Sequence, residues 1–336
     1  MVKENKRLII FLIITTILFC LLFILGLVVG RYNISITSFL KALFTSSEDY
    51  ITERRIIYNL RLPRTIVAGL SGIALSLAGL IYQETFQNKL VSPDLLGVSS
   101  GAGVGAALAI LLGLSSAFVS TFAFLFGLAT VALTLIIAKT FRNKTDIMLV
   151  LSGIVVGGLA SSILSMIKYL ADAETILASI TYWLMGSFAD VTMKSVWLML
   201  PVVAICAIFL LLVSHRINVI ALGKEEAITK GVNYNVYRII IIMISTLLTA
   251  ITVSFCGTIS WIGLVIPHIV RLIVGKNTTR SIPLCITFGG CFMIIVDILS
   301  RVFTTSEIPL SAITGLFGTI IFIIILISRR RKLYEH

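Results

Sequence analysis

The stretch GTISWIGLVIPHIVRLIVG, residues 257–275, is apolar enough to enter a lipid bilayer, yet it contains Pro267, His268 and Arg271. A proline inside a helix removes a backbone hydrogen bond, and an arginine in hydrocarbon costs about 2.5 kcal/mol or more. A segment that only anchors a chain would avoid all three residues. The stretch therefore indicates a function beyond anchoring.

Pro267 also predicts the local structure of this stretch. Its missing N–H leaves the carbonyl of residue 263 without a helical partner, and residue 263 is a glycine, which gives the backbone room to yield. We expect a short or kinked helix. Arg271 lies one turn before the polar run GKNTTR, so we expect its side chain to extend to the aqueous interface, with His268 about a turn deeper.

The composition of the whole chain assigns it to a class. The chain has 336 residues, of which 58% are hydrophobic and 12% charged. This balance excludes a soluble domain and is typical of a polytopic membrane protein. The net charge of +12 does not indicate nucleic-acid binding, because the Lys and Arg residues lie between apolar runs instead of clustering on one face.

Apolar segments of spanning length, about 20 residues each, predict an all-α fold with about ten transmembrane helices in one domain, residues 1–336. The predicted spans are residues 7–29, 62–84, 97–114, 116–138, 146–170, 191–213, 239–256, 259–274, 281–302 and 309–328. An even number of spans places both termini on one side, and most of the 27 Lys and Arg residues lie on that side. The positive-inside rule then predicts that both termini are cytoplasmic.

Two longer polar segments interrupt the spans. Residues 31–61 are predicted on the external side and residues 214–238 on the cytoplasmic side, and each is long enough to contain short helices. Asp297 and Arg301 are four residues apart near the external end of the ninth span, where they can form an ion pair inside the bundle.

The residues that carry chemistry are few. The three histidines and five cysteines have no metal-ligand spacing, and the sequence contains no GxSxG, HExxH or GxxxxGK[ST] motif. We predict a protein that is not an enzyme, with buried thiols, no metal site and no cofactor of its own. If ATP drives it, another chain binds the ATP and its Mg²⁺. An ion-coupled secondary transporter is a weaker alternative, because acidic residues at mid-membrane depth are almost lacking.

The opening stretch closely resembles the signature of the FecCD family of bacterial ABC-importer permeases for iron siderophores, haem and cobalamin. That pattern runs G-x-I-x-F-x-G-L-x-x-P-H-x-x-R-x-x-x-G, and it is matched by Gly263, Pro267, His268 and Arg271, with Trp261 in place of Phe. RLPRTIVAGLSGIALSLAGLIYQ, NKLVSPDLLGVSSGAGVG and LGKEEAITKGVN resemble further motifs of this family. Together they cover nearly the whole chain.

The resemblance implies a permease of the type II import fold in a bacterial plasma membrane, in contact with lipid. It implies three kinds of partner: a second permease chain, identical or related, across a central pathway; two cytoplasmic ATPases; and an extracytoplasmic binding protein. The arginines that meet acidic groups of the binding protein correspond to Arg61, Arg64 and Arg301, which we expect to face solvent.

The resemblance also assigns residues on the cytoplasmic side. Residues 214–238 correspond to the segment that couples to the ATPase, with Gly223, Glu225, Ala227 and Gly231 as its frame. Asn88 and Leu90 correspond to the region that closes the pathway, and Lys89 stands where the family commonly has proline. The expected cargo is a metal chelate, first of all a ferric siderophore, with haem, cobalamin and molybdate as alternatives.

Overall fold

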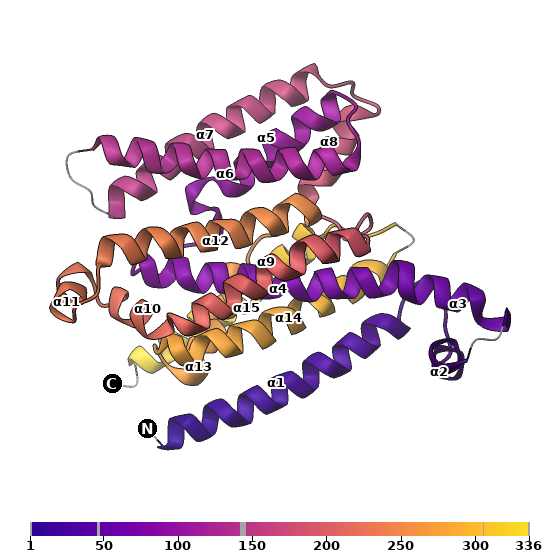
Figure 1. Cartoon of the computed structure of the whole chain (residues 1–336), viewed down its shortest axis with the longest axis horizontal. Helices are drawn as coiled ribbons and strands as arrows, with labels where there is room; N and C mark the ends of the chain where they lie inside the picture. Colours follow the sequence, from indigo (N-terminus) through magenta and orange to yellow (C-terminus); the bar gives the residue numbers. More distant parts are fainter. Residues whose placement is uncertain (1, 46–47, 142–145, 305, 335–336) are drawn as a thin grey trace.

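The structure is a computed structural model that describes residues 2–45, 48–141, 146–304 and 306–334. All regular secondary structure in these residues is helical. The long helices run side by side, and α1 begins at the same end of the bundle at which α15 finishes (Figure 1). We call this the termini end, and the opposite end the distal end.

Ten helices coincide with the ten predicted spans, so the predicted all-α fold is confirmed. They are α1 (Val2–Val28), α4 (Leu62–Thr85), α5 (Val98–Leu111), α6 (Ser116–Thr140), α7 (Asp146–Leu170), α9 (Met193–Leu212), α12 (Tyr234–Cys256), α13 (Ile262–Val274), α14 (Thr278–Val302) and α15 (Leu310–Tyr334). By length and composition, seven of them can cross a membrane, whereas α5, α13 and the apolar part of α15 are shorter.

Helix α13 confirms the short helix expected at Pro267. It has 13 residues, which corresponds to about 20 Å, less than the hydrocarbon thickness. The preceding residues are not helical, because Gly257 and Trp261 both have positive φ, +67° and +72°. The predicted span 259–274 therefore starts about three residues too early.

Helix α4 forms the centre of the bundle, and α14 packs along it (Figure 1). In the most apolar 18-residue stretch of the span that includes α4, 83% of the residues are buried, against 6% in that of α1. Close approach of α4 and α14 depends on glycine, because a Cβ on Gly72 would lie 2.0 Å from the carbonyl oxygen of Gly289. The Ser76 hydroxyl adds a 2.8 Å hydrogen bond to the carbonyl of Cys285.

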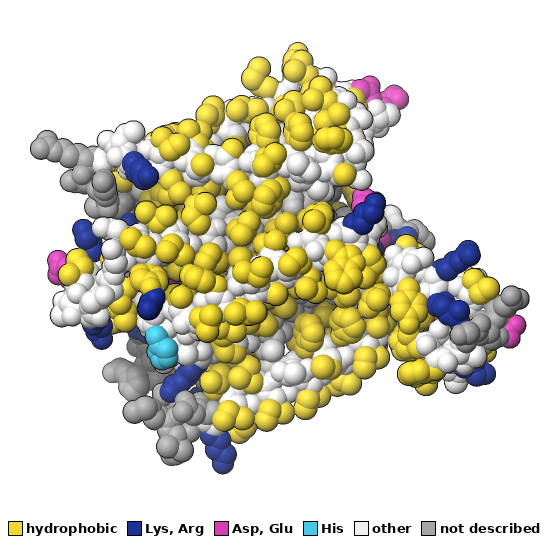
Figure 2. Space-filling model, viewed as in Figure 1, with side chains coloured by type: hydrophobic (Ala, Val, Ile, Leu, Met, Phe, Trp, Pro, Cys, Tyr) yellow, Lys and Arg dark blue, Asp and Glu magenta, His cyan; other side chains and the backbone are white. Residues whose placement is uncertain are grey.

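The surface of the bundle is largely hydrophobic (Figure 2). On α1 this face includes Ile13, Ile17 and Leu21, each more than half exposed. Such a surface is compatible with lipid and not with water. Cys206, Cys256, Cys285 and Cys291 are buried as predicted, whereas the prediction is wrong for Cys20, which is exposed on α1.

Both polar segments contain the short helices expected of them. The distal segment contains α2 (Ile36–Phe44), the 3-10 turn η1 (Glu48–Tyr50), α3 (Ile51–Arg55) and a π-helical stretch, η2 (Ile56–Arg61), that leads directly into α4. At the termini end, α10 (Ser214–Ile220) and α11 (Lys224–Thr229) project between α9 and α12 (Figure 1). Two further short helices are η3 (Pro93–Leu96) and α8 (Ile176–Met185).

Candidate functional site

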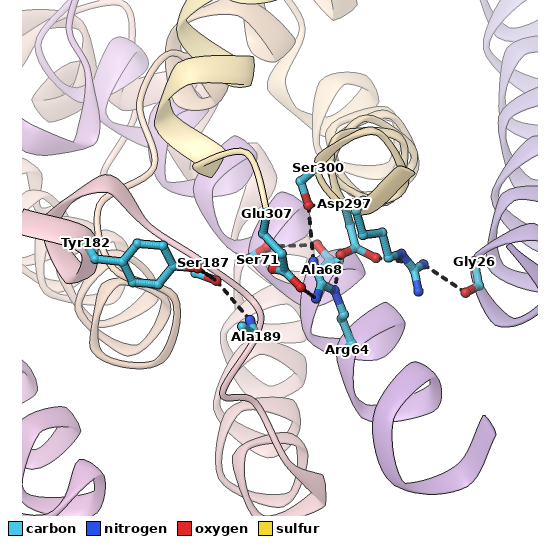
Figure 3. Close-up of polar contacts among 11 residues, drawn as sticks. Gly26, Arg64, Ala68, Ser71, Tyr182, Ser187, Ala189, Asp297, Ser300 and Glu307 are labelled. Atoms are coloured by element: carbon cyan, nitrogen blue, oxygen red, sulfur yellow. Dashed lines mark hydrogen bonds and ion pairs between the residues drawn. The ribbon is translucent and has the colours of Figure 1, made fainter. Parts of the chain in front are cut away.

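A buried ionic cluster lies at the distal end of α4, and we call Arg61, Arg64, Asp297, Arg301 and Glu307 the distal cluster. Arg64 is its centre (Figure 3). Its Nε lies 2.5 Å from Oδ1 of Asp297, and its Nη1 lies 2.6 Å from Oε1 of Glu307. Arg64 thus ties α4 to α14 and to the loop before α15.

The other two arginines of the distal cluster bind the end of α1. Arg301 pairs with Asp297 Oδ2 at 3.0 Å and donates to the carbonyl of Gly26 at 2.8 Å. Arg61 donates to the carbonyl of Leu27 at 3.0 Å, and also to those of Val28 and Tyr32. The last carbonyls of a helix have no partner within it, so these guanidinium groups satisfy the C-terminal end of α1.

The expectation that these three arginines face solvent is wrong for this chain. Arg61, Arg64 and Arg301 are only 4%, 9% and 5% exposed. Sequence reasoning placed them correctly at one end of the bundle, but missed that Asp297 and Glu307 lie between them. Three guanidinium groups against two carboxylates leave one positive charge in excess. Arg61 donates its hydrogen bonds to neutral carbonyls, whereas Arg64 and Arg301 each pair with a carboxylate.

A second polar junction lies at the termini end of α4, and its centre is Gln83, which is 2% exposed. The Gln83 amide nitrogen donates to the carbonyl of Gly263 at 3.1 Å and to that of Val91 at 3.3 Å. Its amide oxygen accepts a hydrogen bond from Arg271 Nη2. We call Gln83, Glu84, Gly263 and Arg271 the Gln83 junction.

The Gln83 junction explains the opening stretch. Pro267 cannot donate to the Gly263 carbonyl, and the Gln83 amide replaces the missing donor. Gly263 is needed because the helices are in backbone contact there: a Cβ on Gly79 would lie 1.9 Å from the Gly263 oxygen, and a Cβ on Gly263 would lie 2.6 Å from Pro93 Cδ. Proline and glycine here shape a three-way contact between α4, α13 and the loop before α5.

The expectation that Arg271 extends to the aqueous interface is wrong. Its side chain is 6% exposed, and its Nη1 lies 3.1 Å from Oε1 of Glu84. The guanidinium group of Arg271 has two acceptors inside the bundle, the side chains of Gln83 and Glu84 at the end of α4. With these hydrogen bonds made, the buried charge is paired and need not reach water. His268 is buried as expected, with its ring centroid 5.9 Å from that of Phe322 on α15.

The loop that contains Asn88 and Leu90 starts at the Gln83 junction. Helix α4 ends with bonds from the amides of Asn88 and Gln87 back to the carbonyls of Gln83 and Glu84, and Gln87 has φ +50°. This is a Schellman motif with a non-glycine residue in its left-handed position. The Asn88 side chain then accepts from the amide of Leu90 at 3.0 Å, and this turn leaves the Leu90 side chain 64% exposed.

The residues predicted to form the coupling frame lie at the termini end of the bundle. Gly223 and Gly231 bracket α11 and have φ of +114° and +73°, which disfavours any side chain there. Ala227 is fully buried, whereas Glu225 is exposed. Two large apolar side chains of this segment, Leu222 and Ile228, are 54% and 61% exposed and therefore available to a partner.

One residue that sequence reasoning missed links this segment to the membrane bundle. The Asn218 side chain on α10 accepts from the amide of Thr278 at 2.7 Å and donates to the side chains of Asn277 and Thr279, each at 3.1 Å. These residues form the N-terminus of α14, whose distal end carries Asp297 and Arg301. Glu84, Glu307 and Asn218 carry no sequence signal of their own, because their partners are distant along the chain. Gln83 is the last residue of the family-like motif RLPRTIVAGLSGIALSLAGLIYQ, which could have drawn attention to it.

The helical bundle, its lipid-compatible surface and its buried polar sites at both ends of α4 are those of a polytopic membrane protein. The model of the FecCD transport family matches residues 17–328, and the chain belongs to this family of ABC-importer permeases. It is accordingly a permease subunit and not an enzyme. Members of the family are polytopic permeases of the bacterial inner membrane, and ABC-importer permeases work with ATPase and binding-protein partners.

The names of the proteins that this chain resembles indicate different transported solutes. The chain is 34% identical to the molybdate import system permease protein MolB of Haemophilus influenzae, over 94% of this chain and 95% of that one. It is 32% identical to a probable iron chelatin transport system permease of Helicobacter pylori, over 85% and 87%. A solved structure described as an inward-facing conformation of a putative metal-chelate type ABC transporter has a TM-score of 0.86 and 33% identity, over 94% of this chain and 98% of that one.

Proposed function

We propose that this chain forms the membrane pathway of an importer that takes a metal-containing solute from a binding protein at the distal end and releases it at the termini end. In this proposal both termini are cytoplasmic, and two copies, or two related chains, enclose the pathway. The observation that carries the proposal is the match to the permease family over residues 17–328, combined with distinct polar sites at the two ends of α4.

At the distal end the excess positive charge of the distal cluster suits an acidic surface of the binding protein. Arg61 is the residue best able to exchange partners, because its three hydrogen bonds go to neutral carbonyls. Arg64 and Arg301 already neutralise Asp297 and Glu307, so their loss would disturb the fold first. The docking function therefore rests mainly on Arg61.

At the termini end the segment 214–238 contacts the ATPase. Leu222 and Ile228 supply apolar contact, and charged Lys224, Glu225 and Glu226 surround them. The Asn218 hydrogen bonds pass a displacement of α10 to the first turn of α14. ATP binding on the partner subunits would thus move the bundle and switch the open side of the pathway.

The proposal has two versions, which differ in the cargo. In the first the cargo is a ferric siderophore, and in the second it is molybdate. The 32% identity to the probable iron chelatin permease over 85% of the chain favours the first, and the 34% identity to the molybdate permease over 94% of the chain favours the second. Titration of the co-purified binding protein with a ferric siderophore and with molybdate distinguishes them. Tight binding of neither, with cobalamin or haem bound instead, would reject both versions.

The coupling assignment is tested by Gly231→Val in the complete transporter. Gly231 has φ +73° and no atom near its added Cβ, so valine strains the backbone by about 1–2 kcal/mol without a clash. We expect ATP hydrolysis to continue while cargo uptake falls several-fold. Gly113→Val is the matched control, because Gly113 also has a positive φ, +64°, and open space but lies at the distal end. Equal loss of uptake in both variants would contradict the assignment.

A further inference from the structure

Helix α2 has an apolar stripe that is exposed and does not pack in the hydrophobic core. Ile36, Leu40 and Phe44, spaced four residues apart, share one face and are 69%, 49% and 84% exposed. The adjacent side of the helix carries Thr37 and Lys41, which are also exposed. The opposite side is buried, with Phe39 at 6% and Ala42 at 1% exposure.

The helix is held firmly, so the stripe is a built surface and not a frayed end. Ser35 caps its N-terminus by accepting from the amide of Ser38 at 3.0 Å. Arg54 of α3 donates to the carbonyls of Ala42 and Thr45 at its C-terminal end. The buried face belongs to a small cluster that includes Ile57 of η2 and Val28 of α1.

The position of α2 defines what can cover the stripe. Its buried face touches the last turn of α1, where the apolar run of the first span gives way to Arg31, so α2 lies at the depth where hydrocarbon ends. In Figure 1 the α2 coil is seen nearly end-on, whereas the spans run across the view. The axis of α2 thus lies roughly parallel to the membrane plane.

The surroundings of the stripe match a lipid interface. In Figure 2 hydrophobic side chains continue from α1 toward this projection, and Lys and Arg side chains lie on its outer part. Lys41, on α2, and the exposed Arg31, just before it, can reach lipid phosphates while the stripe lies among the upper parts of the acyl chains. An amphipathic helix in this orientation is typical of interfacial membrane binding.

We propose that α2 is an interfacial helix that inserts Ile36, Leu40 and Phe44 into the lipid leaflet at the distal end and so fixes the depth of the distal segment. This inference rests only on the chain crossing a membrane and not on the cargo or docking proposals. The distal cluster is joined to α2 through η2 and α1. Insertion of α2 therefore also fixes the position of the distal cluster relative to the membrane surface.

Spin labels on single cysteines test the proposal in the complete transporter, reconstituted into phosphatidylethanolamine and phosphatidylglycerol bilayers without binding protein. The labels go at residues 36, 40 and 44, with Lys41→Cys as the exposed control beside the stripe, in a background in which the exposed Cys20 is replaced by serine. We expect the ratio of collisions with oxygen to collisions with a water-soluble nickel chelate to be several-fold higher at the three stripe positions than at residue 41.

Equal ratios at all four positions would overturn the proposal. It would also be overturned if the stripe is open to the nickel chelate in bilayers and becomes shielded only when the binding protein is added. That second outcome would make the stripe a protein-docking surface. Because all four labels replace exposed side chains, a failure of folding is not expected to imitate either result.

Discussion

The distal cluster and the Gln83 junction lie at opposite ends of α4. Their arginines are buried to a similar extent, but the two sites differ in net charge. The distal cluster contains three guanidinium groups and two carboxylates, whereas the Gln83 junction contains one guanidinium group, one carboxylate and a neutral amide. The distal site therefore keeps an excess positive charge, which the proposed docking of an acidic partner requires. The balanced junction is suited to holding helices and a loop in place.

The comparison shows that a buried arginine alone does not identify a docking site. Arg271 and Arg64 are both nearly inaccessible, and both are satisfied by groups from other helices. What separates the two sites is whether an arginine remains that no carboxylate among the described residues neutralises. On that criterion Arg61 differs from Arg64, Arg271 and Arg301.

The largest effect is expected from Asp297→Asn. This change leaves Arg64 and Arg301 without the carboxylate that they share, and breaking a buried ion pair from one side costs about 3–5 kcal/mol. Thermal unfolding in detergent should show a large loss of stability. Glu307→Gln is the control, because the Glu307 side chain is 18% exposed and touches only Arg64 of the distal cluster, so its loss should be clearly smaller. Equal stability of the two variants would mean that Asp297 is not the centre of the site.

A steric change at the Gln83 junction should rank second. Gly79→Ala places a methyl group 1.9 Å from the Gly263 oxygen, so α4 and α13 must separate at a cost of about 1–3 kcal/mol. Gly69→Ala on the same helix meets its nearest atom at an ordinary 3.5 Å and should be almost neutral. Thermal unfolding of the pair in detergent measures the difference, and equal melting temperatures would disprove the backbone contact.

Removal of the amide should loosen the loop next to the junction. Gln83→Met keeps the length of the side chain and loses its hydrogen bonds to Gly263, Val91 and Arg271, which leaves buried groups unsatisfied at a cost of about 1–3 kcal/mol. Labelling of a cysteine at position 91, where the native valine is 5% exposed, by a maleimide should become faster.

Glu84→Gln is the control for that variant. It removes a charge from the same arginine and keeps an acceptor oxygen, while the Gln83 bonds to the loop stay intact. Labelling at position 91 should then be unchanged. If both variants accelerate labelling equally, Arg271 and not the Gln83 amide holds the loop.

The smallest expected effect tests the distal end. Arg61→Gln should weaken binding of the binding protein by on the order of 1 kcal/mol, more at low salt than at high salt, because the excess positive charge that attracts an acidic partner is lost and salt screens that attraction. Affinity measured across a salt series checks this. Arg31→Gln, at an exposed arginine of the same end, should leave the affinity nearly unchanged. A parallel loss in both variants would indicate a general field of positive charge and not a contact at Arg61.

The sequence by itself determined the class, the ten helices and the position of the motif residues along them. Those features depend on local properties: apolar runs of spanning length, the fixed φ of Pro267 and its missing donor, and glycines that precede turns. The same local reasoning predicted the short α13 and the short helices of both polar segments.

Only the tertiary structure decided what the polar side chains do. The sequence suggested solvent for Arg61, Arg64 and Arg301 and the interface for Arg271, but each of these side chains finds partners more than 25 residues away along the chain or in another helix. In low-dielectric surroundings a charged side chain forms hydrogen bonds with the groups that the packed helices bring within about 3 Å. Which groups those are depends on helix contacts such as Gly72 with Gly289 and Gly79 with Gly263. Sequence separation hides those contacts, which is why Glu84, Glu307 and Asn218 emerged only from the fold.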